Sequence, residues 1–458
     1  MQKPLTIEMQ EVAACNDTDQ QREHHASLIY HTVILSTMIV SVSRSSISGT
    51  VCAPPSKSYT HRAVLITALS DSGCVHRPLI SADTRATISA CEAFGADVNL
   101  KGDSLEIQGV SGTPRTPENV IDVLNSGTTL RFMSAVAALT DGAVLTGDSS
   151  IRSRPNGPLL RALNDLGAEA FSIRGNDRAP LVIRGRLRGG STSLDGSVSS
   201  QFLSALLIAC PLSSGDTTIS IKGELKSRPY AEITLDILRE AGAEIHADGN
   251  RFCMYGGQRY RLQEYTVPGD FSSASYPLAA AALAGSATVQ GLFPSRQGDS
   301  AIVAILRDMG ADVSWDRERG EVRVSRADLR GTEIDASLTP DLVPTLAVLG
   351  AVAEGRTIIK NAEHVRHKET DRIHAMAVEL TKMGADIRER PDGLEIDGGE
   401  LHGADLHGYH DHRIVMALTL AGIVAGDTRI DTAESVDVSY PAFFEDMRRL
   451  GANVGTSP

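Results

Sequence analysis

ACEAFGADV, residues 90–98, is the first of six related stretches that organise this chain. In each of them an amphipathic segment ends at a Gly-Ala pair. The other five are ALNDLGAEA (162–170), ILREAGAEI (237–245), ILRDMGADV (305–313), ELTKMGADI (379–387) and DMRRLGANV (446–454). Because glycine tolerates the left-handed backbone that closes a helix, each pair predicts a helix stop followed by a strand.

A second series interleaves with the first. Apolar segments rich in small residues, such as FLSALLIACPLSSG (202–215), read as helices that end at six glycines: Gly73, Gly142, Gly215, Gly285, Gly355 and Gly426. Successive glycines lie 67 to 75 positions apart in both series. One unit of about 70 residues, with the order helix–strand–helix–strand–strand, is therefore used six times. Six copies divide as three plus three, and they predict α+β domains with helices packed together inside a shell of sheets.

The composition of the chain limits its number of domains and the classes of ligand it can bind. The chain has 458 residues, enough for two or three domains, and 41% of them are hydrophobic. Its formal net charge of −13 argues against non-specific nucleic-acid binding. The six cysteines show no CxxC or other metal-ligand spacing, so they read as reduced thiols packed in a cytoplasmic protein. No metal and no redox cofactor is expected.

The N-terminal stretch differs from the rest. Residues 1–26 are polar and without pattern, and the apolar run at 27–43 is interrupted by His31, Thr32, Ser36 and Thr37. That run is too short and too polar to span a bilayer, and its flank lacks the basic region of a secretion signal. We expect the native start at Met38, with residues 1–37 disordered or not made.

The starts of the predicted buried helices carry the reactive side chains. Ser, Thr, Asn and Asp there are ordinary helix caps, and simple capping is the reading favoured for the fourth start, Asp270–Ser273. The first three starts, at 55–62, 125–129 and 199–202, offer free backbone N–H groups that attract phosphate and carboxylate. If the repeats are pseudo-symmetric, several of these starts converge on one cleft for multiply anionic ligands.

Basic side chains gather beside the helix starts although the chain as a whole is acidic. They are Lys57, Arg62, Arg131, Arg152, Arg154, Lys226, Arg228, Arg366, Lys368, Arg372 and Arg413. Arginine holds carboxylate or phosphate with two parallel hydrogen bonds, so the recurrence indicates an anion site. Asp341 and Glu369 lie among these cations. They suit general acid–base work, and they equally suit surface ion pairs that balance charge.

Eight motifs occur in one order: SKSYTHRA, NSGTTLR, RSRP, SSQF, KSRPY, TPD, RHKETDR and DHR. Together they closely resemble the 5-enolpyruvylshikimate-3-phosphate synthase family over about residues 50–445. The resemblance implies a two-domain, six-repeat inside-out α/β barrel, as in enolpyruvyl transferases, with three repeats per domain. One domain would be 56–266 and the other 38–55 plus 267–458. The hinge would lie near Ala53–Pro55 and Tyr265–Gly269.

The family transfers the enolpyruvyl group of phosphoenolpyruvate to the 5-hydroxyl of shikimate 3-phosphate and releases phosphate, as one step of aromatic amino-acid biosynthesis. The resemblance implies these two small molecules as ligands, no cofactor, and a monomer. It implies three catalytic residues, Asp341 as the base, Glu369 for proton transfer at the methylene carbon together with Lys368, and Lys57. Shikimate 3-phosphate would contact Lys57, Ser58, Arg62, Ser199, Ser200, Gln201, Ser227, Asp341 and Lys368. Phosphoenolpyruvate would contact Lys57, Gly127, Arg154, Gln201, Arg372 and Arg413.

Two positions depart from the family pattern. Val438 stands where a lysine is common, and His364 stands where some members have asparagine. Gly127 keeps the small residue associated with glyphosate sensitivity, so inhibition competitive with phosphoenolpyruvate is expected. Two other readings stay open at this point. One is the enolpyruvyl transferase that acts on UDP-N-acetylglucosamine, which would need a loop cysteine where Cys91 reads as buried. The other is a catalytically inactive binding scaffold built from repeats.

Overall fold

The computed structural model describes residues 38–197 and 199–457. The expectation for residues 1–37 therefore lies outside the described residues, which all belong to one compact unit of the chain. Two helices fall in each of the six repeats. They are α1 (Lys57–Leu69), α2 (Ala82–Ala93), α3 (Gly127–Ala137), α4 (Gly157–Asp165), α5 (Ser200–Ala209), α6 (Arg228–Glu240), α7 (Phe271–Ala284), α8 (Ile302–Asp308), α9 (Val343–Val352), α10 (Arg372–Lys382), α11 (His412–Ala425) and α12 (Phe443–Arg449).

Six four-stranded sheets share one topology. In the order of hydrogen bonding, the first three are β14 (Glu264–Thr266), β3 (Ser72–His76), β5 (Ser104–Gln108) and β4 (Asp97–Lys101); β6 (Ile121–Asp122), β7 (Gly142–Thr146), β9 (Leu181–Arg184) and β8 (Glu169–Ser172); and β10 (Gly190–Asp195), β11 (Thr217–Lys222), β13 (Arg251–Met254) and β12 (Ile245–Asp248).

The other three are β2 (Ile47–Cys52), β15 (Gly285–Gln290), β17 (Glu321–Ser325) and β16 (Asp312–Asp316); β18 (Glu333–Asp335), β19 (Arg356–Lys360), β21 (Gly393–Asp397) and β20 (Asp386–Arg390); and β22 (Asp405–Leu406), β23 (Thr428–Ile430), β1 (Ile39–Ser43) and β24 (Asn453–Ser457). In every sheet the first pair is parallel and the next two pairs are antiparallel. The predicted six-repeat α+β fold is confirmed, with one strand more per repeat than the sequence indicated.

The two glycine series have different structural reasons. All six Gly-Ala glycines have a positive φ, between +83° and +103°, and each follows the last turn of a helix, as predicted. The second series marks helix ends only in part: Gly285 and Gly426 are the C-cap residues of α7 and α11, whereas the prediction is wrong for the other four, which lie beyond the helix. Helix α1 ends at Leu69, and Gly73 lies inside β3. A Cβ on Gly73 would come within 2.2 Å of the Leu262 carbonyl oxygen, so that glycine is required by the close approach of the segment that leads into β14.

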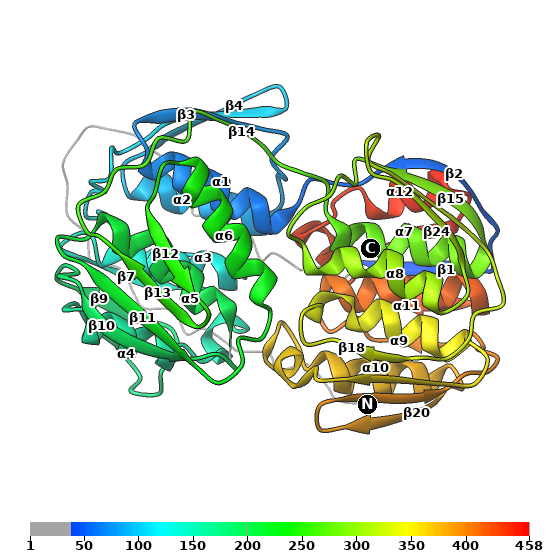
Figure 1. The fold of residues 1–458 in the computed structure, drawn as a ribbon. Coiled ribbons are helices and arrows are strands. Elements are labelled where there is room, and N and C mark those ends of the chain that lie inside the picture. The colour runs from blue at the N-terminus through cyan, green and yellow to red at the C-terminus, as the bar shows by residue number, and fades with distance from the viewer. Residues whose placement is uncertain (1–37, 198, 458) are drawn as a thin grey trace, which may run out of the picture. The chain divides into compact units, whose positions relative to one another are not determined.

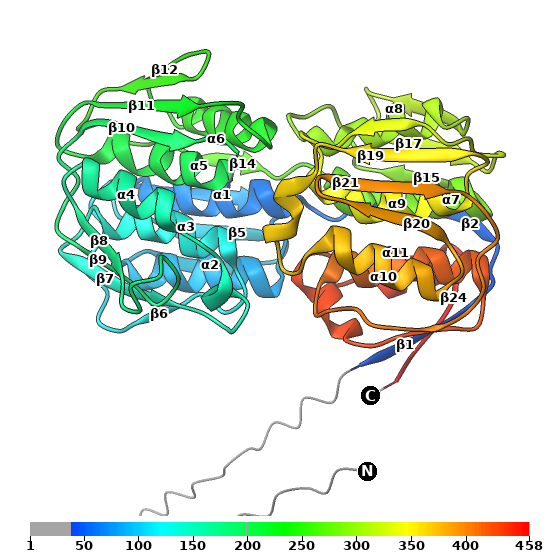
Figure 2. The same ribbon diagram turned by 90° about the horizontal axis from the view of Figure 1, so that it is seen from below.

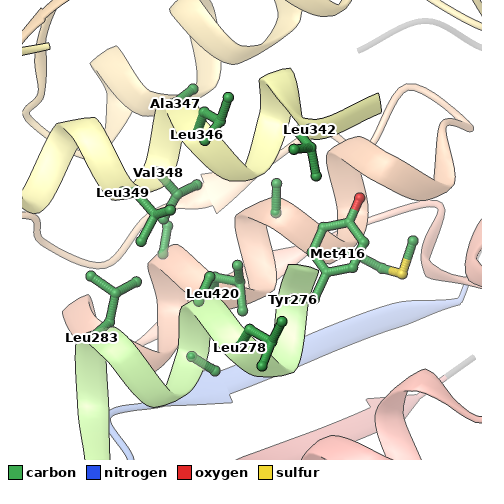
Figure 3. Close-up of a cluster of buried hydrophobic side chains, with 14 of the residues drawn as sticks. Tyr276, Leu278, Leu283, Leu342, Leu346, Ala347, Val348, Leu349, Met416 and Leu420 are labelled. Atoms are coloured by element: carbon green, nitrogen blue, oxygen red, sulfur yellow. The ribbon is translucent and has the colours of Figure 1, made fainter. Parts of the chain in front are cut away.

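The described residues bury two hydrophobic clusters. One draws its members from Tyr59 to Val267, and the other from Val40 to Ala53 and from Phe271 to Val454. Figure 1 shows the helices of each cluster grouped together, and Figure 2 shows α1, α3 and α5 enclosed by the sheets of the first. In the second cluster α7, α9 and α11 pack through side chains such as Leu278, Leu346 and Leu420 (Figure 3).

These central helices are buried on nearly every face. All residues of α9 from Val343 to Ala351 are buried, which explains why the apolar residues of these segments show little helical periodicity. A helix enclosed in this way exposes little except its ends. Its N-terminus is then the place where its backbone N–H groups and its first side chains are available to a ligand.

Two crossover segments join the clusters and run side by side. Pro55 and Gly269 form an antiparallel bridge, the Ser56 N–H donates to the Pro268 carbonyl at 2.8 Å, and the Asp270 N–H donates to the Pro54 carbonyl at 2.8 Å. The domain boundaries expected at 55/56 and 266/267 fall in or next to these segments and stay a prediction.

Candidate active site

Helix starts from both hydrophobic clusters meet at a single cavity. Helices α1, α2, α3, α5 and α6 of the first cluster place residues of their N-terminal ends in its wall, as do α10 and α11 of the second. Asp341, in the 3-10 turn Pro340–Leu342 that precedes α9, also lines the cavity. The start of α7 does not line the cavity; its Asp270 carboxylate accepts from the Ser273 N–H as a helix cap.

All fourteen residues that the family resemblance assigns to the site line this one cavity. They are Lys57, Ser58, Arg62, Gly127, Arg154, Ser199, Ser200, Gln201, Ser227, Asp341, Lys368, Glu369, Arg372 and Arg413. They come from segments as far apart as residues 57 and 413. Both hydrophobic clusters contribute helix starts, so the site depends on the fold of both.

The cavity is strongly cationic. Seven of its lining side chains are lysine or arginine, namely Lys57, Arg62, Arg131, Arg154, Lys368, Arg372 and Arg413. Only three are carboxylates, namely Asp83, Asp341 and Glu369. The excess of four positive charges lies in a chain whose formal net charge is −13. Cations concentrated at helix N-termini favour small molecules with several negative charges.

The guanidinium of Arg372 holds the carboxylates in place. Its Nη1 donates to Asp341 Oδ1 at 2.8 Å, and its Nη2 donates to Glu369 Oε2 at 2.7 Å. Its Nε donates to Asp411 Oδ2 at 2.9 Å behind the cavity. Arg372 is 1% exposed, so its planar fork fixes the separation of Asp341 and Glu369.

Three further cations contact these carboxylates. Arg413 Nη2 lies 3.2 Å from Asp341 Oδ2, and Lys368 Nζ lies 3.7 Å from Asp341 Oδ1. Arg154 Nη2 lies 3.7 Å from Glu369 Oε1. Among the described residues, Arg413 Nη1 and Arg154 Nε have no hydrogen-bond partner although both are buried. These are donors available to an anionic ligand.

The charges shift the acid–base properties of the site. Burial alone would raise the pKa of Asp341, but Arg413, Lys368 and Arg372 together hold that pKa well below its ordinary value. Burial opposes the same effect at Glu369, whose pKa is also held well below normal, by Arg372 and Arg154. Burial lowers the pKa of Lys368, which makes its ammonium a stronger acid than a solvated lysine.

Arg62 is a buried cation whose hydrogen bonds all go to neutral oxygens. Its Nε donates to Thr234 Oγ1 at 2.7 Å and its Nη1 to the Ser58 carbonyl at 2.8 Å. Burial lowers its pKa to about 10, which still leaves it charged at neutral pH. A buried charge without a counter-ion is costly, so this arrangement favours an anion in the cavity.

Four of the basic residues picked out from the sequence do not line the cavity. Arg366 pairs with Asp371 and Glu389, each at 2.7 Å, and Arg228 pairs with Glu232 at 3.2 Å. Lys226 pairs with Glu224 and Glu363, and Arg152 donates to the Gly147 carbonyl. Arg366, Arg228 and Lys226 therefore form the structural ion pairs that the sequence left open as an alternative, whereas Arg152 contacts a neutral carbonyl.

Two polar groups of the site lie outside the set of residues expected from the sequence alone. The Asp83 carboxylate, 6% exposed, accepts from Lys57 Nζ at 2.9 Å, and the Tyr230 hydroxyl donates to Asp341 Oδ2 at 3.0 Å. Tyr230 ends the KSRPY motif, which offered a signal. Asp83 offered none, because an acidic residue in the first turn of a helix is ordinary.

The two departures from the family pattern lie in different places. Val438 does not line the cavity. His364 does, and among the described residues neither of its ring nitrogens has a partner although the residue is buried. Burial, followed by the charges of Lys368 and Lys226, lowers the pKa of His364 to about 3. The imidazole is therefore neutral at physiological pH and can donate one hydrogen bond to a ligand.

The lowered pKa of His364 makes the stability of the folded protein sensitive to acid. The folded state keeps His364 neutral down to about pH 3, whereas an unfolded chain takes up the proton near pH 6.5. Stability is complete above pH 6.5 and falls as the pH drops below it, by about 1.4 kcal/mol per pH unit for one such group. We expect His364→Asn to reduce the loss of unfolding free energy between pH 7 and pH 5 by about 2 kcal/mol.

Urea unfolding of wild type and variant at the two pH values measures that difference. His402→Asn is the matched control, because His402 is exposed and does not line the cavity. Equal losses in wild type and His364→Asn would contradict the buried neutral state.

A family model, curated relatives and solved structures that resemble this chain all carry the name of one enzyme family. The family model described as EPSP synthase (3-phosphoshikimate 1-carboxyvinyltransferase) matches residues 42–447. The 3-phosphoshikimate 1-carboxyvinyltransferase of Methanothrix thermoacetophila is 92% identical over 420 residues, which cover 92% of this chain and 100% of the relative. That of Methanococcoides burtonii is 62% identical over 422 residues, which cover 91% of this chain and 99% of the relative.

A solved structure of EPSP synthase from Acinetobacter baumannii superimposes with a TM-score of 0.79 at 27% identity, covering 92% of this chain and 100% of that one. Among residues 38–197 and 199–457 no helix is long and apolar enough to cross a membrane. The rival reading that needed a reactive loop cysteine finds no support at Cys91, which is 2% exposed within α2 and whose thiol pKa is raised by burial.

Proposed function

The chain belongs to the EPSP synthase family, and we infer that it transfers the enolpyruvyl group of phosphoenolpyruvate to the 5-hydroxyl of shikimate 3-phosphate and releases phosphate. The observation that supports this inference is that all fourteen residues matched to the family motifs line one cationic cavity. The two substrates together carry two phosphates and two carboxylates, which suits that charge.

Shikimate 3-phosphate would bind on the side of the first cluster. Ser199, Ser200 and Ser227 would hold its phosphate, and Arg62 supplies a buried cation with no carboxylate partner of its own. Gln201 would lie between the two substrates. Its side-chain oxygen accepts from Arg131 Nη1, and its nitrogen donates to Thr128 Oγ1 at 3.0 Å, so its orientation is fixed.

Phosphoenolpyruvate would bind between the clusters. Arg154 and Arg413 have buried donor atoms to offer, and Arg372 would contact the same ligand. Gly127 allows the start of α3 to come close, and Lys57 would reach both substrates. Closure of the two halves around the ligands would exclude water, which protects the tetrahedral intermediate.

The chemistry needs a proton at carbon and a base at oxygen. A proton delivered to the methylene carbon of phosphoenolpyruvate makes its central carbon electrophilic. The 5-hydroxyl oxygen attacks that carbon while Asp341 takes the hydroxyl proton. Loss of a proton from the resulting methyl group, together with departure of phosphate, then restores the double bond. Glu369 and Lys368 would give and take the proton at carbon.

Ligand binding would itself prepare the acid–base pair. The cations that hold the pKa of Asp341 and Glu369 well below normal are those that would bind the substrate anions. Once phosphate and carboxylate groups neutralise Arg413 and Arg372, both carboxyl pKa values should rise toward the range needed for proton transfer. The carboxylates would thus be activated only when substrate is present.

The direct test is phosphate release by the purified protein with phosphoenolpyruvate and shikimate 3-phosphate, each omitted in turn. We expect release only when both are present. Folded protein that binds shikimate 3-phosphate by calorimetry but releases no phosphate would point to another acceptor or to a binding scaffold.

The space at Gly127 gives a second test. A Cβ there would lie 2.7 Å from Arg154 Nη1 and would push the guanidinium aside. Gly127→Ala should raise KM for phosphoenolpyruvate by about 10- to 100-fold while leaving KM for shikimate 3-phosphate nearly unchanged. It should also weaken inhibition by glyphosate, which we expect to compete with phosphoenolpyruvate.

Gly399→Ala is the matched control, because a Cβ there meets nothing within 4 Å. Equal KM values for phosphoenolpyruvate in wild type and Gly127→Ala would remove Arg154 from the proposed contacts. A monomeric state and a cytoplasmic location, which the family resemblance implies, complete the proposal; sedimentation analysis at micromolar concentration tests the first, and fractionation of the native cells tests the second.

A further inference from the structure

We propose that Cys74, His76 and Glu264 form a binding site for a thiophilic divalent cation of the Zn²⁺ type on the outer face of the sheet β14-β3-β5-β4. One donor atom from each of the three side chains lies within 4.8 Å of the other two. None of the three lines the proposed active site, so this site is separate from it.

Strand register explains why the three side chains meet. Cys74 and His76 are two residues apart on β3 and therefore point to the same face of the sheet. Glu264 is the direct partner of Cys74 on the parallel strand β14, and Glu106 is its direct partner on β5. The row Glu264–Cys74–Glu106 thus crosses three strands on one face, with His76 one step along β3.

The contacts are close to those of a coordination sphere. Cys74 Sγ lies 3.8 Å from His76 Nδ1, and His76 Nε2 contacts the Glu264 carboxylate. Sulfur and nitrogen bound to one tetrahedral zinc would be separated by roughly 3.6 Å. The side chain of His76 is 40% exposed and that of Glu264 is 69% exposed, so a solvated ion can reach both.

The chemical types of the three donor groups determine which metal ion the site favours. A thiolate, an imidazole and a carboxylate are the three ligand types that proteins use for zinc, whereas calcium and magnesium require oxygen ligands. Burial and the negative charges of Glu264 and Glu106 raise the pKa of the Cys74 thiol. A bound cation would reverse that effect and release the proton.

The fourth position has two candidates on the same face. Glu106 stands opposite Cys74 and at present contacts Lys101 Nζ, and water can occupy the position otherwise. His76 would bind the ion through Nδ1, which faces Cys74 Sγ, so the present contacts of Nδ1 with Ser104 Oγ at 3.0 Å and of Nε2 with Glu264 would give way to the ion. The ion would join β14 to β3 just before Thr266, where the chain leaves this sheet for its second crossover.

Titration of the full chain with Co²⁺, in the absence of substrates and with a phosphine reductant, tests the proposal. Cobalt bound to a cysteine thiolate gives a near-ultraviolet charge-transfer absorption that oxygen and nitrogen ligands alone do not give. We expect that band to saturate at one equivalent. Competition with Zn²⁺ should abolish it.

Single-residue variants show which side chains bind the Co²⁺ that gives the absorption band. Cys74→Ser should remove it, and His76→Ala and Glu264→Gln should each weaken Co²⁺ affinity at least about tenfold. Cys253→Ser is the matched control: Cys253 is also a partly exposed strand cysteine facing a histidine, His246, but with no carboxylate in the cluster. Its band should equal that of wild type.

A wild-type protein without the band, or a band that persists in Cys74→Ser, would overturn the proposal. Because Glu264 is exposed, Glu264→Gln should fold normally, and thermal unfolding without metal checks this for each variant. An affinity for Co²⁺ that is equal in wild type and Glu264→Gln would remove the carboxylate from the site.

Discussion

Asp341→Asn is expected to lower kcat by about 10²- to 10⁴-fold, the usual contribution of a general base, with a much smaller change in KM for either substrate. Asparagine keeps the shape of the side chain and can still accept from Arg372 through its carbonyl. What it loses is the ability to take the proton of the attacking hydroxyl. Single-turnover phosphate release, measured with saturating substrates, separates this loss from any change in binding.

The control for Asp341 is Asp397→Asn, which removes another aspartate that is paired with an arginine. Asp397 accepts from Arg356 at 2.8 and 2.9 Å on the exposed surface of β19 and β21, away from the cavity. Its kcat should equal that of wild type. If Asp341→Asn kept more than about a tenth of wild-type kcat, the base would have to be sought elsewhere, with Glu369 the next carboxylate to replace.

Arg372→Met is expected to have the largest effect on stability, lowering the free energy of unfolding by about 3–5 kcal/mol. Most of this cost falls on Asp411, which is completely buried and accepts from Arg372 Nε at 2.9 Å. Asp341 keeps Arg413 and Lys368 as partners, and Glu369 keeps Arg154. Removing the guanidinium therefore leaves the buried Asp411 carboxylate without its charged partner. The folded state then carries the full free-energy cost of an unpaired buried charge.

The same variant should lose activity even where it folds, because the fork that spaces Asp341 and Glu369 is gone. Urea unfolding and phosphate release, measured on the same preparation at low temperature, record the two effects. A double variant Arg372→Met/Asp411→Asn should recover much of the stability but little of the activity. Arg356→Met, which breaks an exposed pair, should change neither. Recovery of activity together with stability would show that Arg372 acts only as a counter-ion.

The repeated fold could be predicted because its signal is periodic and local. A helix that ends in a residue with left-handed backbone favours glycine at that point. Six Gly-Ala pairs at similar spacing therefore mark six helix ends in the sequence. The parallel strand that opens each sheet could not be predicted in the same way. Strands β6 and β22 are only two residues long, so no alternation of side chains is visible, and they are defined by their pairing with β7 and β23.

The residues of the active site also divide into those that could be predicted from the sequence and those that could not. Many of the motif residues were found because they lie at the starts of helices, where only an end is available for chemistry; others, such as Arg154 and Glu369, lie in turns and loops and were found through the motifs alone. Asp83 was not found, because its importance comes from a contact with Lys57, 26 positions earlier, that nothing in its own surroundings announces. Arg366 was a false candidate for the converse reason: sequence places it among functional residues, while the structure pairs it with Asp371 and Glu389.

The pairing of β1 with β23 and β24 has a consequence for how the protein is made. Val40 pairs with Ile430, 390 positions later, and β2 pairs with β15 across the whole intervening segment. During synthesis the segment from α1 to β14 can complete its three sheets as soon as β14 leaves the ribosome. Strand β2 must wait for β15, which follows soon after β14, but β1 must stay unpaired until β23 and β24 at the other end of the chain have followed, and such strand edges are open to aggregation. The middle of the chain should therefore fold first and its two ends last, so the nascent protein should depend most on chaperones before its final repeats emerge.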